Sequence, residues 1–366
     1  MPNDTMTPKQ RWLAAIHMKP VDRLPFWPKL GASYPPAQAA PFRGMTLDAL
    51  HAWIGSDKHG WLAAGLREAR TATRIETSER DGVHTTVYHT PHGALRLVQH
   101  FDPASQSWHP VEFPVKTRAD LAAMTAFWRD EKVDVDADGM AAARERYRQV
   151  GEEELLGVGI GESPLMQWVE WLAGVENAHY LLADFPAEVE ELFAAIHAVL
   201  VRKTQLLAEH HPADVFYMVE NTSTTLISPD QYRRYCLGHV SEYGRILQSA
   251  GRPLVLHMCG HLKALLPDLA RVPARAFEAF TSPTLGNTTM LDGRTHCPET
   301  CLIGGTNAML WTRPAAEIIA RLKADLDVLP HHRGIVVTSA GVMPPLCRPE
   351  TIRDVCQWVR GYPART

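Results

Sequence analysis

Residues 253–261 read Pro-Leu-Val-Leu-His-Met-Cys-Gly-His. Apolar, partly β-branched residues follow a Gly-Arg-Pro break and lead to His257 and Cys259, after which Gly260 permits a turn. This pattern predicts a buried strand that ends at a loop. Because side chains alternate along a strand, His257 and Cys259 are expected to point to the same side of its end.

An imidazole nitrogen and a thiolate on one side of a strand end can bind the same metal ion. Zinc is the first candidate because it accepts both kinds of ligand. A single His-x-Cys pair is a weak motif, however. The alternative is a core histidine hydrogen-bonded to backbone beside a small buried cysteine, and periodicity alone favours that alternative. The position of the pair at the end of a strand is what supports the metal site.

The composition indicates a globular protein without a nucleic-acid or membrane partner. The chain has 366 residues, of which 45% are hydrophobic and 21% charged, and its formal net charge is −4. Lysine and arginine are scattered, so no basic surface is expected. No apolar run reaches the ~18 residues of a membrane span, and no signal-peptide pattern begins the sequence. We therefore predict a cytoplasmic protein whose six cysteines are core residues or ligands, not a disulfide framework.

Strand and helix patterns alternate along most of the chain. After an opening helix and a short strand at 22–27, apolar strands are expected at 155–160, 214–219, 254–257, 276–280, 301–307 and 334–339. These segments give six to eight parallel strand-helix units. No Gly-x-Gly-x-x-Gly loop follows the first strand. A (β/α)8 TIM-type barrel with an N-terminal helical extension is therefore favoured over a doubly wound sheet.

Three stretches depart from this alternation. Residues 71–116 contain strand-like segments with turns at Asp81-Gly82 and His92-Gly93, which predicts an inserted antiparallel β-hairpin or meander. Residues 44–70 are expected to be an interrupted helix, and residues 117–150 a charged helical stretch. The chain from 1 to 366 is expected to form a single domain.

The active site of a (β/α)8 barrel lies at the carboxyl ends of its strands. Polar residues are concentrated at the predicted strand ends beyond what solubility requires. They are Glu162, Glu220, Asn221, His257, Cys259, Glu278, Asn307, Ser339 and, in the last loop, Cys347.

The order of these segments resembles the uroporphyrinogen decarboxylase-like superfamily, and within it most closely the zinc-dependent, corrinoid-linked methyltransferases. The resemblance covers nearly the whole chain, and His-x-Cys-Gly at a strand end is its most specific element. The matching segments include Asp22-Arg23-Leu24-Pro25, Thr90-Pro91-His92-Gly93, Gly161-Glu162-Ser163-Pro164-Leu165, His257-Met258-Cys259-Gly260 and Gly304-Gly305-Thr306-Asn307.

In the methyltransferase branch, the matching His and Cys bind zinc together with a third cysteine from the loop after the last strand. The resemblance thus implies that His257 and Cys259 are metal ligands. The family's third cysteine falls a few residues before Cys347, where this chain has none. Glu278 resembles the carboxylate that cobalamin-independent methionine synthases place in a similar site. Cys347 ranks slightly ahead of Glu278 as the third ligand.

The decarboxylase branch is disfavoured. Its members hold carboxylate-rich substrates with an arginine-rich loop after the first strand, whereas residues 28–34 contain no arginine. The nearest match to that branch's Phe-Ser-Asp stretch is Gly55-Ser56-Asp57, which is a poor one. Because bidentate carboxylate recognition is an arginine task, a porphyrinogen would meet too little positive charge.

The resemblance implies a zinc-dependent methyltransferase, in which zinc activates an acceptor thiol or polarises a methyl-bearing oxygen. The expected catalytic residues are Glu220 and Glu278, and the expected substrate-binding residues are Glu162, Asn221, Asn307 and Ser339. No cobalamin-binding Asp-x-His-x-x-Gly signature is present, so the corrinoid is expected on a separate partner protein. A metal-independent decarboxylase and a non-catalytic corrinoid or tetrapyrrole carrier are the alternatives. The methyl donor and acceptor, the direction of transfer and the oligomeric state stay open.

Overall fold

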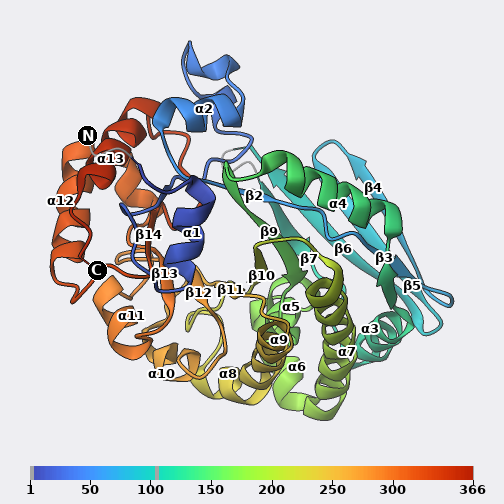
Figure 1. Cartoon of the computed structure of the whole chain (residues 1–366). Helices are drawn as coiled ribbons and strands as arrows, with labels where there is room; N and C mark the ends of the chain where they lie inside the picture. The colour runs from blue at the N-terminus through green and yellow to red at the C-terminus, as the bar shows by residue number, and fades with distance from the viewer. Residues whose placement is uncertain (1–3, 104–106, 366) are drawn as a thin grey trace.

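The computed structural model describes residues 4–103 and 107–365. Eight strands curl into a nearly closed barrel in the order β1-β14-β13-β12-β11-β10-β9-β2, and neighbouring strands are parallel (Figure 1). The prediction of a (β/α)8 barrel is confirmed. In chain order the strands are β1 (Phe26–Trp27), β2 (Lys58–Trp61), β9 (Glu154–Gly161), β10 (Val215–Val219), β11 (Leu254–His257), β12 (Ala276–Phe280), β13 (Cys301–Gly304) and β14 (Ile335–Thr338).

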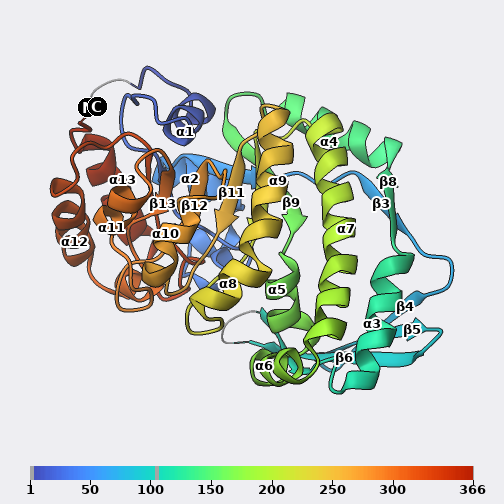
Figure 2. The ribbon, with the colours of Figure 1, turned by 90° about the horizontal axis from the view of Figure 1, so that it is seen from below.

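Helices surround the barrel, as β/α crossovers require (Figure 2). Several begin at residues that the sequence pattern identifies, such as Ser228, whose hydroxyl caps the next helix in a capping box. The helices that follow the barrel strands are α2 (Leu47–Ile54), α5 (Pro164–Gln167), α6 (Val175–Asp184), α7 (Pro186–His210), α8 (Pro229–Tyr235), α9 (Leu237–Ser249), α10 (Leu266–Leu269), α11 (Met290–His296), α12 (Ala315–Asp327) and α13 (Pro349–Gly361).

The helix α1 (Pro8–Ile16) packs against the barrel interior at the end where the strands begin. Thr7 and Gln10 form the capping box at its start. Trp12 and Ile16 belong to the same buried cluster as the inward side chains of the barrel, which include Val215 and Val255. Side chains of α1 therefore fill the barrel interior at the amino ends of the strands, and open space lies at the carboxyl ends.

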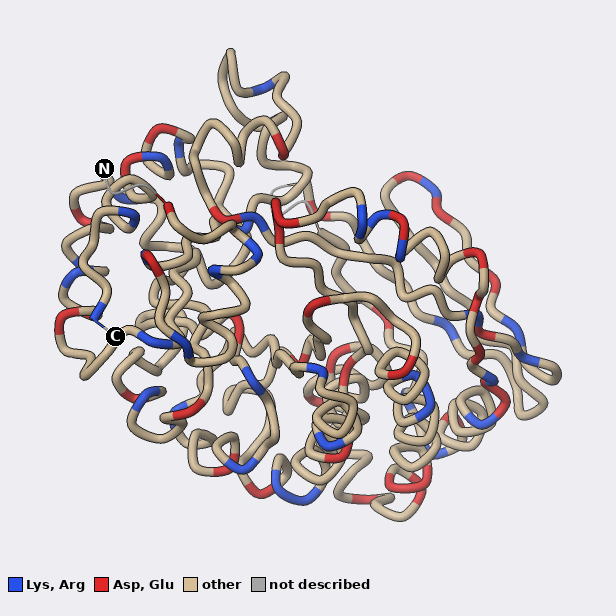
Figure 3. The backbone as a smooth tube through the Cα atoms, in the orientation of Figure 1, with Lys and Arg blue, Asp and Glu red and all other residues tan. Residues whose placement is uncertain are grey.

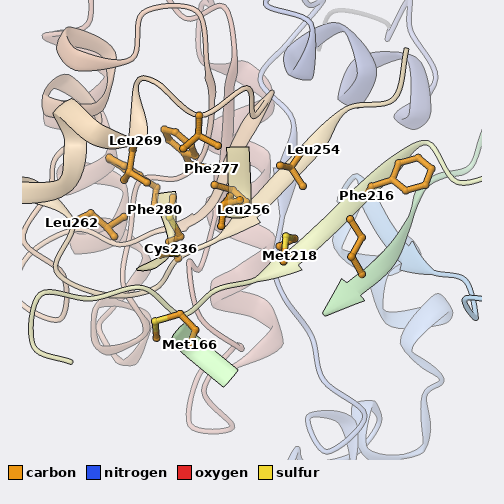
Figure 4. Packing of buried hydrophobic residues seen from close by; sticks show 14 of the residues in the cluster. Met166, Phe216, Met218, Cys236, Leu254, Leu256, Leu262, Leu269, Phe277 and Phe280 are labelled. Carbon is orange, nitrogen blue, oxygen red and sulfur yellow. The ribbon is translucent and has the colours of Figure 1, made fainter. Parts of the chain in front are cut away.

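The outward faces of the barrel strands form a second layer of the core. Phe216, Met218, Leu254 and Leu256 are almost completely buried against the outer helices (Figure 4). Burial of such side chains stabilises the fold by roughly 1.5–3 kcal/mol each. Because both faces of these strands are covered, their sequences are continuous apolar runs, which is why the pattern identifies them.

A buried ion-pair network holds the two-residue strand β1 beside β2. Asp57, which precedes β2, accepts hydrogen bonds from the guanidinium groups of Arg11 and Arg23 and from the backbone N–H of Phe26 at 3.0 Å. Asp22 engages the other edge of the Arg11 guanidinium at 2.7 Å. The Asp22-Arg23-Leu24-Pro25 segment thus fixes the position from which residues 26–29 enter the barrel.

The insertion is a four-stranded antiparallel sheet, as the meander prediction requires, and it lies beside the barrel (Figure 1). One face of this sheet packs on α3 (Arg118–Asp130), which in turn packs on α7. Its strands are β4 (Arg74–Arg80), β5 (Val83–Thr90), β6 (Gly93–Asp102) and β7 (Ser107–Glu112).

Two expectations about secondary structure were wrong. Residues 44–70 are not one interrupted helix, because α2 ends before the barrel strand β2 and the strand β3 (Leu66–Ala69). The charged stretch 117–150 is broken by β8 (Lys132–Val135), which pairs antiparallel with β3, before α4 (Ala137–Val150) begins. Both missed segments lack continuous apolar runs, since β2 reads Lys-His-Gly-Trp and β8 alternates charged residues with valine.

Acidic and basic residues are interspersed along the outer helices and loops (Figure 3). Within residues 4–103 and 107–365, no helix is both long enough and apolar enough to cross a membrane.

Candidate functional site

The His-x-Cys segment lies where the sequence places it. His257 is the last residue of β11, and Cys259 follows in the loop. On the neighbouring strand β12, Glu278 is in register with His257, so the two side chains enter the barrel at the same height. Two consecutive strands therefore bring together residues 21 positions apart in sequence.

An ion-paired triad of Lys29, Glu278 and His257 occupies the carboxyl end of the barrel. The Glu278 carboxylate contacts His257 Nδ1 through one oxygen and the Lys29 ammonium, at 2.9 Å, through the other. Glu278 is only 2% exposed. No sequence pattern singles out Lys29, which reaches Glu278 from the loop after β1.

Charge pairing keeps this triad ionised although it is buried. Burial alone would lower the pKa of His257, but the Glu278 carboxylate and a hydrogen bond with Cys259 raise it to about 9. Burial would likewise raise the pKa of Glu278, but Lys29 and His257 lower it to about 2. At neutral pH the group thus carries a carboxylate between two cations.

Asn221 connects Cys259 to a carboxyl group that the sequence analysis missed. The Cys259 thiol donates to Asn221 Oδ1 at 3.5 Å, and Asn221 Nδ2 donates to Glu170 at 2.9 Å. Asn221 has a φ of 42°, in the left-handed region where asparagine is better tolerated than most residues. Glu170 lies on a single π-helical turn, Trp168–Leu172, a distortion that is frequent at functional sites.

The mouth of the barrel is the end at which its strands stop. Its acidic side consists of Glu162, Glu220 and Asn221, directly after β9 and β10, and of Glu170 on the π-helical turn. Burial and the proximity of Glu170 raise the pKa of Glu162 to about 8. Burial also raises the pKa of Glu170 to about 7, against the hydrogen bond from Asn221. Two carboxyl groups thus retain protons close to neutral pH, which is the property that a general acid needs.

Glu220 is the most buried member of the acidic side, at 1% exposure. It accepts a hydrogen bond from the backbone N–H of Ser163 at 2.7 Å and one from the Cys236 thiol at 3.5 Å. These bonds tie the loop after β9 to β10 and α8. Its expected role as a catalytic carboxylate stays a prediction.

The aromatic side of the mouth consists of Trp27, His59 and Trp61, on β1 and β2, and it lies next to Lys29 in the loop after β1. The Trp27 and His59 rings are stacked with their centroids 4.7 Å apart, and Trp61 lies 5.0 Å from His59. Sequence analysis missed this side because β2 was not identified as a strand. The alternation of the rings of His59 and Trp61 with Lys58 and Gly60 is the sequence pattern that could have indicated this strand.

Two other expected site residues hold loops together. Asn307 donates to the backbone of Pro283 at 2.9 Å and caps the following turn through Leu310 N–H at 3.0 Å. The Ser339 hydroxyl accepts from Lys29 N–H at 3.3 Å and donates to a backbone carbonyl. Their substrate-binding roles stay predictions.

Cys347 has partners of its own, apart from His257 and Cys259. Its thiol donates to the Arg348 carbonyl at 3.8 Å, and its own carbonyl accepts a hydrogen bond from Tyr34. Burial raises the pKa of Cys347 to about 12, so the thiol is protonated in this arrangement. All six cysteines are free, and five of them are buried, whereas Cys259 is exposed.

The donor atoms around His257 fit zinc in kind. His257, Cys259 and Glu278 offer the nitrogen, sulfur and oxygen ligands that zinc accepts. Within the described parts of the chain, however, no three or more His, Cys, Asp or Glu side chains are arranged to hold a metal ion. Metal binding would require Glu278 to exchange its contacts with Lys29 and His257 for the ion.

Comparison with known proteins identifies the family of this barrel. The profile of the family described as "Uroporphyrinogen decarboxylase (URO-D)" matches residues 111–362, well over half of the chain. The chain belongs to the uroporphyrinogen decarboxylase family. A search of curated proteins found no match.

Among solved structures, a methyltransferase from Methanosarcina mazei is similar to this member of the uroporphyrinogen decarboxylase family. The TM-score is 0.59 at 16% sequence identity, over 97% of this chain and 98% of that chain. A Listeria monocytogenes structure described as a putative vitamin-B12 independent methionine synthase has a TM-score of 0.45 at 11% identity, over 93% and 96% of the two chains. The first likeness shows a shared fold that includes the amino-terminal region.

The uroporphyrinogen decarboxylase family profile covers the acidic side of the mouth but not the aromatic side. The acidic side, together with His257, Cys259 and Glu278, lies within the matched residues 111–362. The aromatic side belongs to the first 61 residues, which precede the match. The family assignment therefore bears on the first group and leaves the aromatic side to be interpreted from its own geometry.

Proposed function

We propose that this protein is a zinc-dependent methyltransferase that moves a methyl group between a small substrate and a corrinoid carried by a separate partner protein. The observation that carries the proposal is that His257 contacts both Glu278, in register on β12, and Cys259, in the loop after β11. The fold shared with the methyltransferase from Methanosarcina mazei supports it.

We assign the three protein ligands of zinc to His257, Cys259 and Glu278. Contact between Glu278 and His257 favours Glu278 over Cys347, whose thiol is buried and directed to a backbone carbonyl. When bound, zinc with three protein ligands supplies an open Lewis-acid position for a thiol or a methyl-bearing oxygen.

The remaining residues would act by orientation and proton transfer. Asn221 orients Cys259 through the 3.5 Å hydrogen bond from the thiol. Glu162 and Glu170 hold protons near neutral pH and can deliver one to a leaving group of the substrate. Lys29 limits the negative charge that Glu278 and Cys259 bring to the site.

Metal analysis of the full-length protein, purified without chelators, tests the ligand assignment. We expect about one zinc per chain, because a site with three protein ligands and one open position holds a single ion. His257→Ala, Cys259→Ser and Glu278→Ala should each lose the metal, whereas the matched control Cys347→Ser should keep it. Metal-free wild-type protein would contradict the proposal, and loss of zinc in Cys347→Ser alone would contradict the choice of Glu278.

A decarboxylase is the second candidate, favoured by the family to which the chain belongs. Lys29 offers one cation to a substrate carboxylate, although Glu278 already engages it. This candidate predicts release of carbon dioxide without metal and indifference to Cys259→Ser. Transfer of the methyl group from free methylcobalamin to an added thiol by zinc-loaded protein, giving the methyl thioether and cob(I)alamin and followed by visible absorbance, would favour the methyltransferase instead. Tight pigment binding without turnover would indicate a carrier.

A further inference from the structure

A cavity of about 400 Å³ lies at the seam of the barrel, where β1 and β2 approach each other. In the described part of the chain these two strands are not joined by a hydrogen-bonded ladder. The cavity is lined by Trp27, His59 and Trp61 and bordered by Lys29 and Lys58. Its volume lies within the range of roughly 300–1,000 Å³ that small-molecule sites occupy.

Two glycines of β9 explain why aromatic rings fit here and why space remains above them. A Cβ added to Gly157 would lie 3.1–3.3 Å from the rings of His59, Tyr217 and Trp61, so these rings fill the room that a side chain would take. Two residues further along the same face, a Cβ on Gly159 would meet nothing within 4 Å. Open space therefore follows the rings along this face of β9, next to the residues that line the cavity.

Trp61 provides an uncovered aromatic surface. Although it ends a barrel strand and its ring lies 4.7 Å from that of Tyr217, the side chain is 52% exposed. Trp27 and His59 continue the wall as a stacked pair. A planar ring placed against an exposed indole buries a large apolar area and gains stacking energy.

One polar ring of this wall lacks a side-chain partner. His59 lines the cavity and is 8% exposed, yet neither of its ring nitrogens has a side-chain hydrogen-bond partner among the described residues. Burial lowers the pKa of His59 to about 4, so the neutral ring offers one donor and one acceptor. Because unpaired buried polar groups are costly, such atoms are typical of a site that a ligand completes.

The charges on the lining favour an anion. The cavity is lined by three cations and two carboxylates. Lys58 and Arg146 are held by Asp48 and Glu154, at 2.8–3.5 Å. The Lys29 ammonium lies 5.4 Å from the centre of the Trp27 ring and is paired with Glu278, which it shares with the cation His257.

We propose that this seam cavity binds an aromatic ring that carries an anionic oxygen substituent, with the ring against Trp61 and the oxygens directed to Lys29 and His59. Aromatic walls select the planar ring, and Lys29 selects the sign of its charge. As an assignment of the substrate class this inference rests on the proposed methyl transfer, whereas binding in the cavity requires neither zinc nor turnover.

Isothermal titration of the full-length protein with four probes tests the inference. Benzoate should bind at least about tenfold more tightly than cyclohexanecarboxylate, which lacks the aromatic ring, and than benzyl alcohol and benzylamine, which lack the negative charge. Equal binding of cyclohexanecarboxylate would overturn the stacking role, and tighter binding of benzylamine would overturn the choice of charge. Absence of benzoate binding up to about 10 mM would overturn the site altogether.

Variants locate the bound probe. Trp61→Leu should weaken benzoate binding about tenfold, while Trp61→Phe should keep most of it because a ring is retained. Tyr180→Leu, which removes an exposed aromatic residue from α6, is the matched control and should bind benzoate as wild type does. Unchanged binding in a folded Trp61→Leu, or lost binding in the control, would place the probe elsewhere and contradict the proposal.

Zinc content measured on the same preparations separates this inference from the proposed function. Benzoate binding by protein that takes up no zinc would contradict only the methyltransferase. Zinc-loaded protein that does not bind benzoate would contradict this inference and leave the methyltransferase proposal standing.

Discussion

Burial shifts the pKa of a carboxyl on the acidic side of the mouth upward and the pKa of a histidine on the aromatic side downward. On the acidic side, burial raises the pKa of Glu162 and keeps the carboxyl protonated near neutral pH. On the aromatic side, burial lowers the pKa of His59 and removes the proton from the imidazole. Desolvation disfavours the charged form in both cases, so an acid and a base both become neutral.

The ion-paired triad differs from both sides because its charges compensate one another. Glu278 is as buried as Glu220, but it lies between Lys29 and His257, which lower its pKa instead of leaving it raised. The triad therefore stays charged although it is buried, because its members are in contact with one another. A reaction that needs a charged centre would use the triad, and one that needs a proton donor would use the acidic side.

The largest expected effect is that of Glu278→Gln. The substitution leaves Lys29 and His257 side by side without a counter-charge, and breaking a buried ion pair on one side costs about 3–5 kcal/mol. We expect a loss near the lower end, about 3 kcal/mol, because His257 can release its proton once Glu278 is neutral. Urea unfolding at pH 7 measures the change.

The double variant Lys29→Met/Glu278→Leu is the control for charge. Removing both partners should cost less than removing Glu278 alone, because no buried charge is left unpaired. If the double variant is the less stable of the two, the contrast between a charged triad and two neutral sides is wrong.

The barrel itself was predictable because most of its strands are buried on both faces. Strands such as β10 and β11 are apolar runs bounded by turn residues, and their order alone predicts parallel crossovers. The residues at the ends of these strands, His257 and Glu278 among them, could be located for the same reason. Sequence patterns could not predict β2, because its inward residues are His59 and Trp61 and no aliphatic residues recur along it.

The contacts within the site were harder to predict from the sequence than the residues that form it. Lys29 and Glu278 are 249 positions apart, and only closure of the barrel brings the loop after β1 to β12. Glu170 depends on a π-helical turn that no local pattern specifies. Its available signal was a lone carboxylate between Trp168 and Trp171 in an otherwise apolar segment.

An intermediate effect is expected from Gly157→Ala, which probes the aromatic side. The new methyl group would lie 3.1–3.3 Å from three packed rings, so the wall must shift. Overpacking of this kind costs about 1–3 kcal/mol. Gly159→Ala, on the same face of β9 and with open space above it, is the matched control and should change the free energy of unfolding by less than about 0.5 kcal/mol. Equal effects in the two variants would mean that the rings are not fixed as a wall.

The smallest effect is expected from Glu162→Gln, and it depends on pH. The pKa of this carboxyl is about 8 in the folded protein, whereas the carboxyl of an unfolded chain releases its proton near 4.5. The folded state therefore loses stability as the pH rises from about 4.5 to about 8, and this loss disappears in the glutamine variant. We expect Glu162→Gln to be as stable as wild type at about pH 4 and more stable by about 1–2 kcal/mol at about pH 9. A change of one unit in the pKa corresponds to about 1.4 kcal/mol. The expected gain is smaller than the whole change in pKa would give, because water reaches the mouth and screens the carboxylate.

Urea unfolding across this pH range measures the difference, with the exposed Glu317→Gln as a control that should show none. Glu170 and Glu220 face the same group, so their own titration broadens the transition. A stability difference that is already present under acidic conditions, or absent under alkaline ones, would mean that Glu162 is ionised in the folded protein. Burial would then not keep the carboxyl groups of the acidic side protonated. The acidic side would be negatively charged at neutral pH, whereas the His59 ring on the aromatic side would be neutral.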